Sequence, residues 1–120
     1  MHILIADQFE NIRKGIKRIL LEEFPSARID EAADWTELES KIGVNGCNLL
    51  VADFTALNNG ADELQQLRRR FPALPIVAMG IHSAEYYART LVKAGANDYL
   101  RKDIAPEELV KTVNRVLSGG

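Results

Sequence analysis

The amino-acid sequence predicts an α/β fold, a doubly wound, five-stranded parallel sheet with helices on both of its faces. Two observations support this fold class. Five short apolar segments alternate along the chain with five segments whose apolar residues recur at helical spacing. Strands that alternate with helices are typical of parallel sheets, whose right-handed crossover connections place helices on both faces.

The expected strands are short apolar segments, most of which end at a polar residue or a glycine. They lie at residues 3–6, 27–31, 48–53, 75–80 and 98–101. The run 49–52 is apolar at every position, as expected for a strand that is covered on both faces. Residues 27–31 are more polar and make the weakest of the five predictions.

The segments that follow the strands carry apolar residues three or four positions apart, which indicates amphipathic helices. Their inward residues are expected to be Phe9, Ile12, Ile16, Ile19 and Leu20; Trp35, Leu38 and Ile42; Leu64, Leu67 and Phe71; Tyr87, Leu91 and Ala94; and Leu109, Val113, Val116 and Leu117. Pro25, Gly43, Pro72 and Gly95 mark the ends of the first four helices, and Pro106 opens the fifth.

Length and composition indicate a single domain over residues 1–120, with 118–120 as a tail or the start of a linker. The chain is 47% hydrophobic and 27% charged, which is typical of globular rather than disordered proteins. Its longest apolar run is far shorter than the ~20 residues of a membrane span, and its start lacks a secretory-signal pattern. The net charge of −2 gives no basic excess for nucleic-acid binding. We therefore expect a cytoplasmic domain that binds neither membranes nor nucleic acid.

Chemically useful residues follow four of the predicted strands. Asp7, Asp53, Gly80 and Lys102 come at the ends of the first, third, fourth and fifth strands, and ligands of open parallel sheets bind at that edge. Two neighbouring carboxylates favour a divalent cation such as Mg²⁺. A carboxylate can also attack phosphorus, and a lysine can pair with phosphoryl oxygens. Taken singly, either aspartate could instead cap a helix, and Lys102 could be a solvated surface lysine.

Taken together, these residues resemble a known family. The segments 3–7 (ILIAD), 49–53 (LLVAD) and 93–103 (KAGANDYLRKD) stand in the order found in the receiver domain of two-component response regulators. With residues 106–109 (PEEL) after them, the chain looks closest to the NarL/FixJ-type branch, and the resemblance covers essentially the whole chain. It implies the flavodoxin-like, CheY-like arrangement with strand order 2-1-3-4-5.

The resemblance also implies residue roles in phosphorylation. Asp53 would be the phosphoacceptor, and Lys102 would contact the phosphoryl group. Gly80 stands where the family has a serine or threonine that hydrogen-bonds the phosphoryl group, so a backbone N–H would have to replace the hydroxyl. Tyr99 stands at the position of the aromatic switch residue, which in the family rotates between an outward and an inward position. The donor would be a sensor histidine kinase or a phosphotransfer domain.

For Mg²⁺, the resemblance implies a pocket formed by Asp7, Gln8, Asp53 and the backbone carbonyl of Thr55. The family normally has a second acid directly after the first, and here that position is Gln8. A neutral amide lacks the negative charge that an acid would place beside the cation, and this loss would weaken Mg²⁺ binding by orders of magnitude. We therefore expect Mg²⁺ to be held weakly or not at all.

Three functions remain open from the sequence. The chain is either a receiver phosphorylated on Asp53 or a pseudo-receiver that acts through protein–protein contacts without phosphorylation. A phosphatase or phosphotransferase acting on an external substrate fits poorly, because Thr55 rather than a second acid stands two residues after Asp53. No enzyme activity is expected beyond self-phosphorylation from a donor and autodephosphorylation.

Receiver domains signal through the surface of their fourth helix, fifth strand and fifth helix. The resemblance implies that this surface binds an output domain or a second copy of the chain. The outward residues expected there are Tyr86, Arg89, Lys93, Lys111 and Arg115. No DNA-binding segment lies within residues 1–120, so such a domain would have to follow Gly120.

Overall fold

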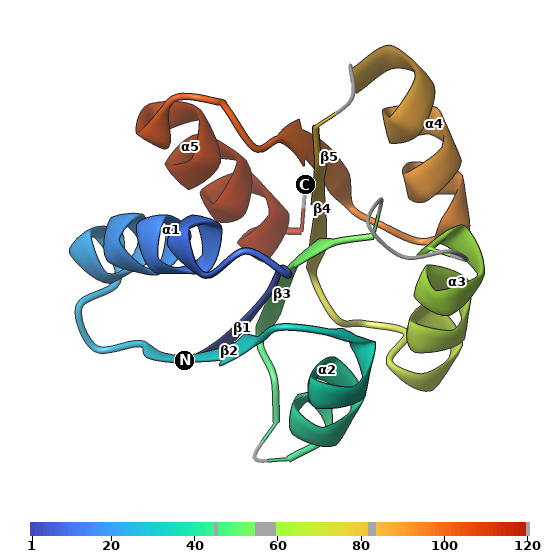
Figure 1. Cartoon of the computed structure of the whole chain (residues 1–120), viewed down its shortest axis with the longest axis horizontal. Helices are drawn as coiled ribbons and strands as arrows, with labels where there is room; N and C mark the ends of the chain where they lie inside the picture. Colours follow the sequence, from blue (N-terminus) through green and yellow to red (C-terminus); the bar gives the residue numbers. More distant parts are fainter. Residues whose placement is uncertain (45, 55–59, 82–83, 120) are drawn as a thin grey trace.

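The computed structural model describes residues 1–44, 46–54, 60–81 and 84–119, with only the backbone of residues 84, 86 and 87. Five parallel strands form one sheet: β1 (His2–Ala6), β2 (Arg28–Ala32), β3 (Leu49–Asp53), β4 (Ile76–Gly80) and β5 (Asp98–Arg101). Their order is β2-β1-β3-β4-β5 (Figure 1). The predicted fold class and strand order are therefore confirmed.

The helices alternate with the strands as the periodicity predicts. They are α1 (Glu10–Glu23), α2 (Trp35–Ile42), α3 (Gly60–Arg70), α4 (Ala84–Ala94) and α5 (Pro106–Leu117). Helices α1 and α5 cover one face of the sheet, and α2, α3 and α4 cover the other (Figure 1). Within the described ranges, no helix has the length and apolar content that crossing a membrane requires.

Two apolar layers follow from the two-residue period of a strand. Ile3 and Ile5 of β1 pack in the layer under α1 and α5, whereas Leu4 and Ala6 pack in the layer under α2, α3 and α4. Because successive side chains point to opposite faces, a strand buried on both faces needs apolar residues at every position. This requirement explains the continuous apolar runs in the sequence.

The second strand departs most from its prediction. Residues 27–31 were expected, and β2 runs from Arg28 to Ala32. It lies at one edge of the sheet, with β1 as its single neighbour. A strand at a sheet edge tolerates polar side chains such as Asp30 and Glu31, which are half-buried here.

A close backbone contact fixes the start of α3 beside the end of β3. Gly60, the first residue of α3, is buried, and a Cβ atom added to it would lie 1.9 Å from the backbone oxygen of Phe54. Only glycine allows this approach. The contact holds α3 against the residue that follows Asp53.

Candidate functional site

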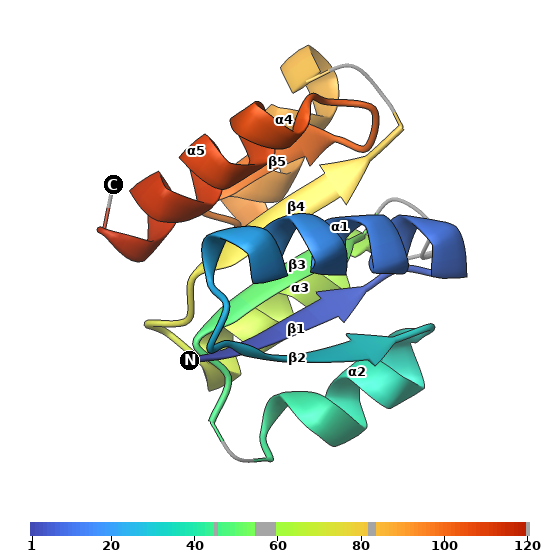
Figure 2. The ribbon, with the colours of Figure 1, turned by 90° about the vertical axis from the view of Figure 1, so that its left-hand side faces the viewer.

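Two buried aspartates meet at the carboxyl edge of the sheet. Asp7 comes one residue after β1, and Asp53 is the last residue of β3. These strands are neighbours, with Ala6 opposite Ala52, and all five strands run in the same direction (Figure 2). Each aspartate side chain is only 3% exposed.

Lys102 reaches both aspartates from the far side of β4. Its ammonium nitrogen lies 2.6 Å from Oδ2 of Asp7 and 2.5 Å from Oδ2 of Asp53, and its side chain is 8% exposed. The backbone N–H of Lys102 donates to the carbonyl oxygen of Gly80 at 3.0 Å, which fixes the start of this side chain against the end of β4. Because β4 lies between β5 and β3, the Lys102 side chain crosses the end of β4 to reach Asp53. The last residue of β4 is Gly80, which has no side chain to block this path.

The charges of this cluster stabilise one another. Burial by itself would lower the pKa of Lys102, but the hydrogen bonds and charges of Asp53 and Asp7 outweigh burial and raise it. The ring centroid of Phe9 lies 5.3 Å from the ammonium nitrogen, within range of a cation–π contact. Lys102 is therefore a buried, charged lysine rather than a solvated surface lysine.

Asp7 is a residue of the charged cluster and also accepts a backbone hydrogen bond just before α1. Its Oδ1 accepts a hydrogen bond from the backbone N–H of Phe9 at 2.8 Å, while Oδ2 contacts Lys102. The N-cap residue of α1 is Phe9, so Asp7 stabilises the turn before the helix rather than capping it directly. Asp53 is the last residue of a strand, and α3 begins only at Gly60.

A cavity of about 140 Å³ opens beside the two carboxylates. It is lined by Ala6, Asp7, Gln8, Ala33, Asp34, Trp35, Leu38, Asp53 and Phe54. The structure thus brings Gln8 to the aspartates, whereas Thr55 lies outside the described residues. Sequence reasoning missed Asp34 and Trp35 as residues of this site. Their signal was their position after the second strand, which ends at the same edge of the sheet.

These donors are a poor match for Mg²⁺. Both carboxylates contact the Lys102 ammonium, and Gln8 offers a neutral amide in place of a third carboxylate. In the part of the chain that the structure describes, no three His, Cys, Asp or Glu residues are grouped in a way that could hold a metal ion. The arrangement is a buried ion cluster in which two carboxylates share one ammonium.

The residue expected to act as a switch points into the protein. Tyr99 lies on β5 opposite Ala78 and is 3% exposed. It belongs to the apolar layer that also contains Leu91 and Ala94 of α4. This is the inward of the two positions implied by the resemblance.

Four residues expected on the outer surface are exposed, namely Arg89, Lys93, Lys111 and Arg115. Arg115 on α5 forms an ion pair with Asp98 on β5, which ties these two elements together. The side chain of Tyr86 lies outside the described residues.

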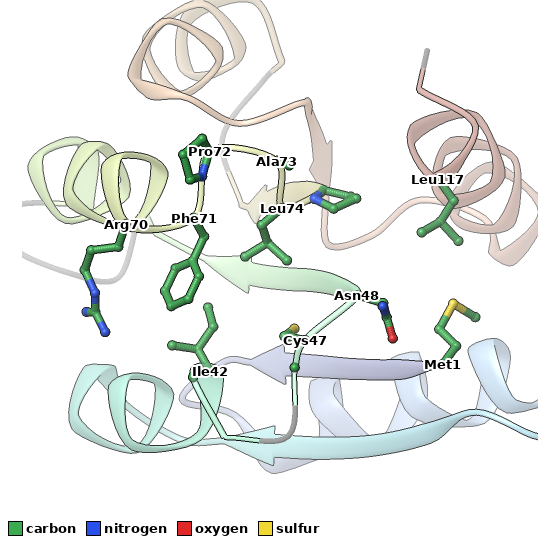
Figure 3. Close-up of a pocket in the computed structure, with 13 residues that line it drawn as sticks. Met1, Ile42, Cys47, Asn48, Arg70, Phe71, Pro72, Ala73, Leu74 and Leu117 are labelled. Carbon is green, nitrogen blue, oxygen red and sulfur yellow. The ribbon is translucent and has the colours of Figure 1, made fainter.

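A larger groove of about 930 Å³ lies at the opposite, amino-terminal edge of the sheet (Figure 3). Ile42, Phe71 and Leu74 give it an apolar wall, and Cys47 faces it. Burial raises the pKa of the Cys47 thiol, so this cysteine is a poor nucleophile at neutral pH. None of the predicted site residues lines this groove.

Comparison with known proteins agrees with this geometry. The family model described as "Response regulator receiver domain" matches residues 3–114. The transcriptional regulatory protein DegU of Brevibacillus brevis is 26% identical over 121 residues, covering 100% of this chain and 51% of that protein. The uncharacterized transcriptional regulatory protein YhcZ of Bacillus subtilis is 30% identical over 121 residues, covering 100% of this chain and 56% of that protein. The chain thus spans about half the length of the curated relatives it matches.

Solved structures show the same fold. A two-component response regulator from Clostridium difficile is 26% identical with a TM-score of 0.86, covering 98% of this chain and 96% of that one. The receiver domain of NtrX from Brucella abortus is 23% identical with a TM-score of 0.87, covering 98% of this chain and 99% of that one. Given the family match over residues 3–114 and an ordered acidic site at the expected sheet edge, the chain belongs to the response regulator receiver domain family of two-component systems.

Proposed function

We propose that this receiver domain accepts a phosphoryl group on Asp53 from a sensor histidine kinase or a phosphotransfer domain. Receiver domains are generally signalling modules rather than enzymes, and the chemistry proposed here is limited to the phosphorylation of Asp53 and its later hydrolysis. One observation carries the proposal. Lys102 contacts both Asp53 and Asp7 in a buried cluster at the carboxyl edge of the sheet.

The cluster can support phosphoryl transfer mainly by position and charge. A carboxylate oxygen of Asp53 attacks phosphorus, the bond from phosphorus to the donor nitrogen breaks, and an acyl phosphate forms. The Lys102 ammonium lies close enough to Asp53 to balance the charge of the phosphoryl oxygens. Burial of Asp53 limits the access of water that would hydrolyse the product.

Receiver domains generally bind Mg²⁺ at an acidic pocket, and in this chain we propose that Mg²⁺ is bound weakly or not at all. Gln8 supplies one negative charge less than an acid would. Between unit charges 4 Å apart, that charge contributes about 4 kcal/mol at an effective dielectric of 20 and about 1 kcal/mol in water. Affinity for the cation would then fall by one to three powers of ten.

The phosphorylation signal would leave through the surface formed by α4, β5 and α5. Arg89 and Lys93 are exposed on α4, and Tyr99 packs in the apolar layer beneath that helix. The partner would be an output domain or a second copy of the chain. Because DegU and YhcZ are named as transcriptional regulatory proteins, we propose a transcriptional output domain, with residues 118–120 at the start of the linker to it.

A pseudo-receiver that signals without phosphorylation is the second candidate. Two features favour it, namely the neutral amide of Gln8 beside the carboxylates and the missing hydroxyl at Gly80. Without that hydroxyl, a phosphoryl group on Asp53 has no side-chain donor on β4 through which to influence Tyr99.

Intact mass spectrometry separates the two candidates. The protein is incubated with acetyl phosphate, with and without Mg²⁺, beside an Asp53→Asn variant. The proposed function predicts a gain of roughly 80 Da, one phosphoryl group, in the parent chain and none in the variant. No gain by the folded protein favours the pseudo-receiver, and a gain that persists in the variant rules out Asp53 as the acceptor.

A further inference from the structure

We infer that Arg13 is a positioning residue, which holds the backbone of Asp7 in place so that the Asp7 carboxylate meets Lys102 beside Asp53. Arg13 bonds to the backbone of Asp7 and to the side chain of Glu31 on the edge strand β2. It therefore acts on the carboxylate through the chain. The inference rests on the proposed function in taking Asp53 and its neighbours as the working site.

Arg13 reaches Asp7 because of its place in α1. It lies in the first turn of the helix, and its backbone N–H donates to the carbonyl oxygen of the N-cap residue Phe9 at 3.2 Å. Side chains on a helix lean toward its N-terminus, so the guanidinium of Arg13 points back toward the end of β1. There its Nη1 donates to the backbone carbonyl oxygen of Asp7 at 2.7 Å.

Glu31 fixes the other side of the guanidinium. Nε of Arg13 donates to Oε1 of Glu31 at 3.0 Å, and the two side chains are only 13% and 15% exposed, so the pair is largely shielded from water. A guanidinium carries its N–H groups in a rigid plane. Bonds to two acceptors on different segments therefore fix both its position and its direction.

These contacts close a ring around the backbone of Asp7. The N–H of Asp7 donates to the carbonyl oxygen of Ala32 at 3.0 Å, and Ala32 directly follows Glu31 in β2. The carbonyl oxygen of Asp7 is held by Arg13, which is itself anchored on Glu31. Both sides of the Asp7 backbone are thus tied to β2, and the carboxylate extends from this fixed point to the Lys102 ammonium at 2.6 Å.

Removal of the guanidinium should loosen this arrangement. The carbonyl oxygen of Asp7, a buried residue, would lose its donor, and a buried polar group without a partner is unfavourable. The turn after β1 should then shift toward another donor. A shift of about 1 Å is enough to lengthen the contact with Lys102 beyond hydrogen-bond distance.

Nuclear magnetic resonance reads these positions without any phosphoryl donor. The backbone N–H signal of Asp7 and the Nζ–H signal of Lys102 are followed in the parent chain, in Arg13→Met and in Arg13→Lys. Lys14→Met is the matched control, because the Lys14 ammonium contacts the same glutamate at 2.7 Å from an exposed position. Urea unfolding measures the stability of each chain separately. Phosphorylation by acetyl phosphate then gives a maximal rate and a half-saturating donor concentration.

We expect Arg13→Met to shift the signals of Asp7 and Lys102. It should also lower the maximal rate, by up to about a hundred-fold for a misplacement of about 1 Å. The half-saturating concentration should stay nearly the same, because Arg13 acts on Asp7 and not on the donor. Lys14→Met should keep the signals and the rate of the parent chain. Arg13→Lys keeps the charge but not the planar set of donors, so it should restore stability more fully than the positions of the two signals.

Two results would overturn the inference. One is an Arg13→Met chain that loses stability but keeps the Asp7 and Lys102 signals of the parent chain, which would make Arg13 a residue of the fold alone. If Arg13→Met does not fold, the same result in Arg13→Lys is decisive. The other is an equal shift in Arg13→Met and Lys14→Met, which would attribute the effect to the charge around Glu31. If the parent chain takes up no phosphoryl group, the proposed function fails, and the two signals still decide whether Arg13 positions Asp7.

Discussion

Arg68 ties together three segments at the amino-terminal edge of the sheet, and its removal should destabilise the domain. Its Nε and one Nη donate to the carbonyl oxygen of Gly95 at 2.9 and 2.7 Å. The other Nη donates to the carbonyl oxygens of Phe71 and Leu74 at 3.0 and 2.7 Å. These carbonyls follow α3 and α4, whose ends favour a positive charge.

The expected loss follows from these contacts. A hydrogen bond to a charged group contributes about 1.5–3 kcal/mol, but the bonds of one guanidinium are not additive and Arg68 is only half-buried. We therefore expect Arg68→Met, which keeps the apolar stem, to lower the free energy of unfolding by about 2–4 kcal/mol. Arg68→Lys should lose less, because it keeps the charge but not the planar set of donors.

Urea unfolding followed by circular dichroism measures this difference. Arg69→Met is the matched control, because Arg69 is the exposed neighbour of Arg68 on the same helix. Surface substitutions of this kind usually change stability by at most about 0.5 kcal/mol. If Arg68→Met loses no more than Arg69→Met, the guanidinium contacts contribute nothing to stability and the reasoning is wrong.

Two further predictions concern stability. Gly60→Ala should lower the free energy of unfolding by about 1–3 kcal/mol or more, because the added Cβ would lie 1.9 Å from the Phe54 backbone oxygen. Gly15→Ala in α1, where an added Cβ has nothing within 4 Å, should be neutral or stabilising. Equal thermal unfolding midpoints for the two variants would contradict this prediction. For Glu31, burial raises the pKa, but hydrogen bonds from α1, including one from Arg13, outweigh burial and lower it below 4.5. A carboxyl group whose pKa is lower in the folded than in the unfolded state stabilises the fold while it is ionised. This stabilisation is lost as the pH falls through the folded-state pKa. Glu31→Gln should therefore be less stable at pH 7, by a margin that narrows on acidification; a margin independent of pH would refute the assignment.

The sheet could be read from the sequence because its strands are buried on both faces. The run from Leu49 to Ala52 is apolar at every position, and only a covered strand requires that pattern. The same reasoning located Asp7, Asp53 and Lys102, since parallel strands bring their carboxyl ends to one edge. Strand β2 was less well defined, because an edge strand carries polar residues that local patterns do not distinguish from a loop.

The rest of the candidate site depended on side-chain packing. Asp34 and Trp35 line the cavity. Their position after the second strand indicates the edge of the sheet, but it does not show that these residues lie beside the two aspartates. Phe9 was expected to be an inward residue of the first helix, and it is instead the N-cap, 51% exposed and stacked over the Lys102 ammonium. Such contacts join segments that are far apart in the chain, so the spacing of apolar residues along one helix or strand does not predict them.

The sequence by itself determined the fold class, the strand order through family resemblance, and the edge at which the charged residues gather. These follow from apolar periodicity and from the handedness of parallel crossovers, which are local or general rules. Only the tertiary structure decided that Lys102 spans the end of β4 and contacts both aspartates at once. The reason is that a buried charge must find its counter-charges within a few ångströms. Which carboxylates lie that close is fixed by the register of four strands, β1, β3, β4 and β5, and not by any one segment.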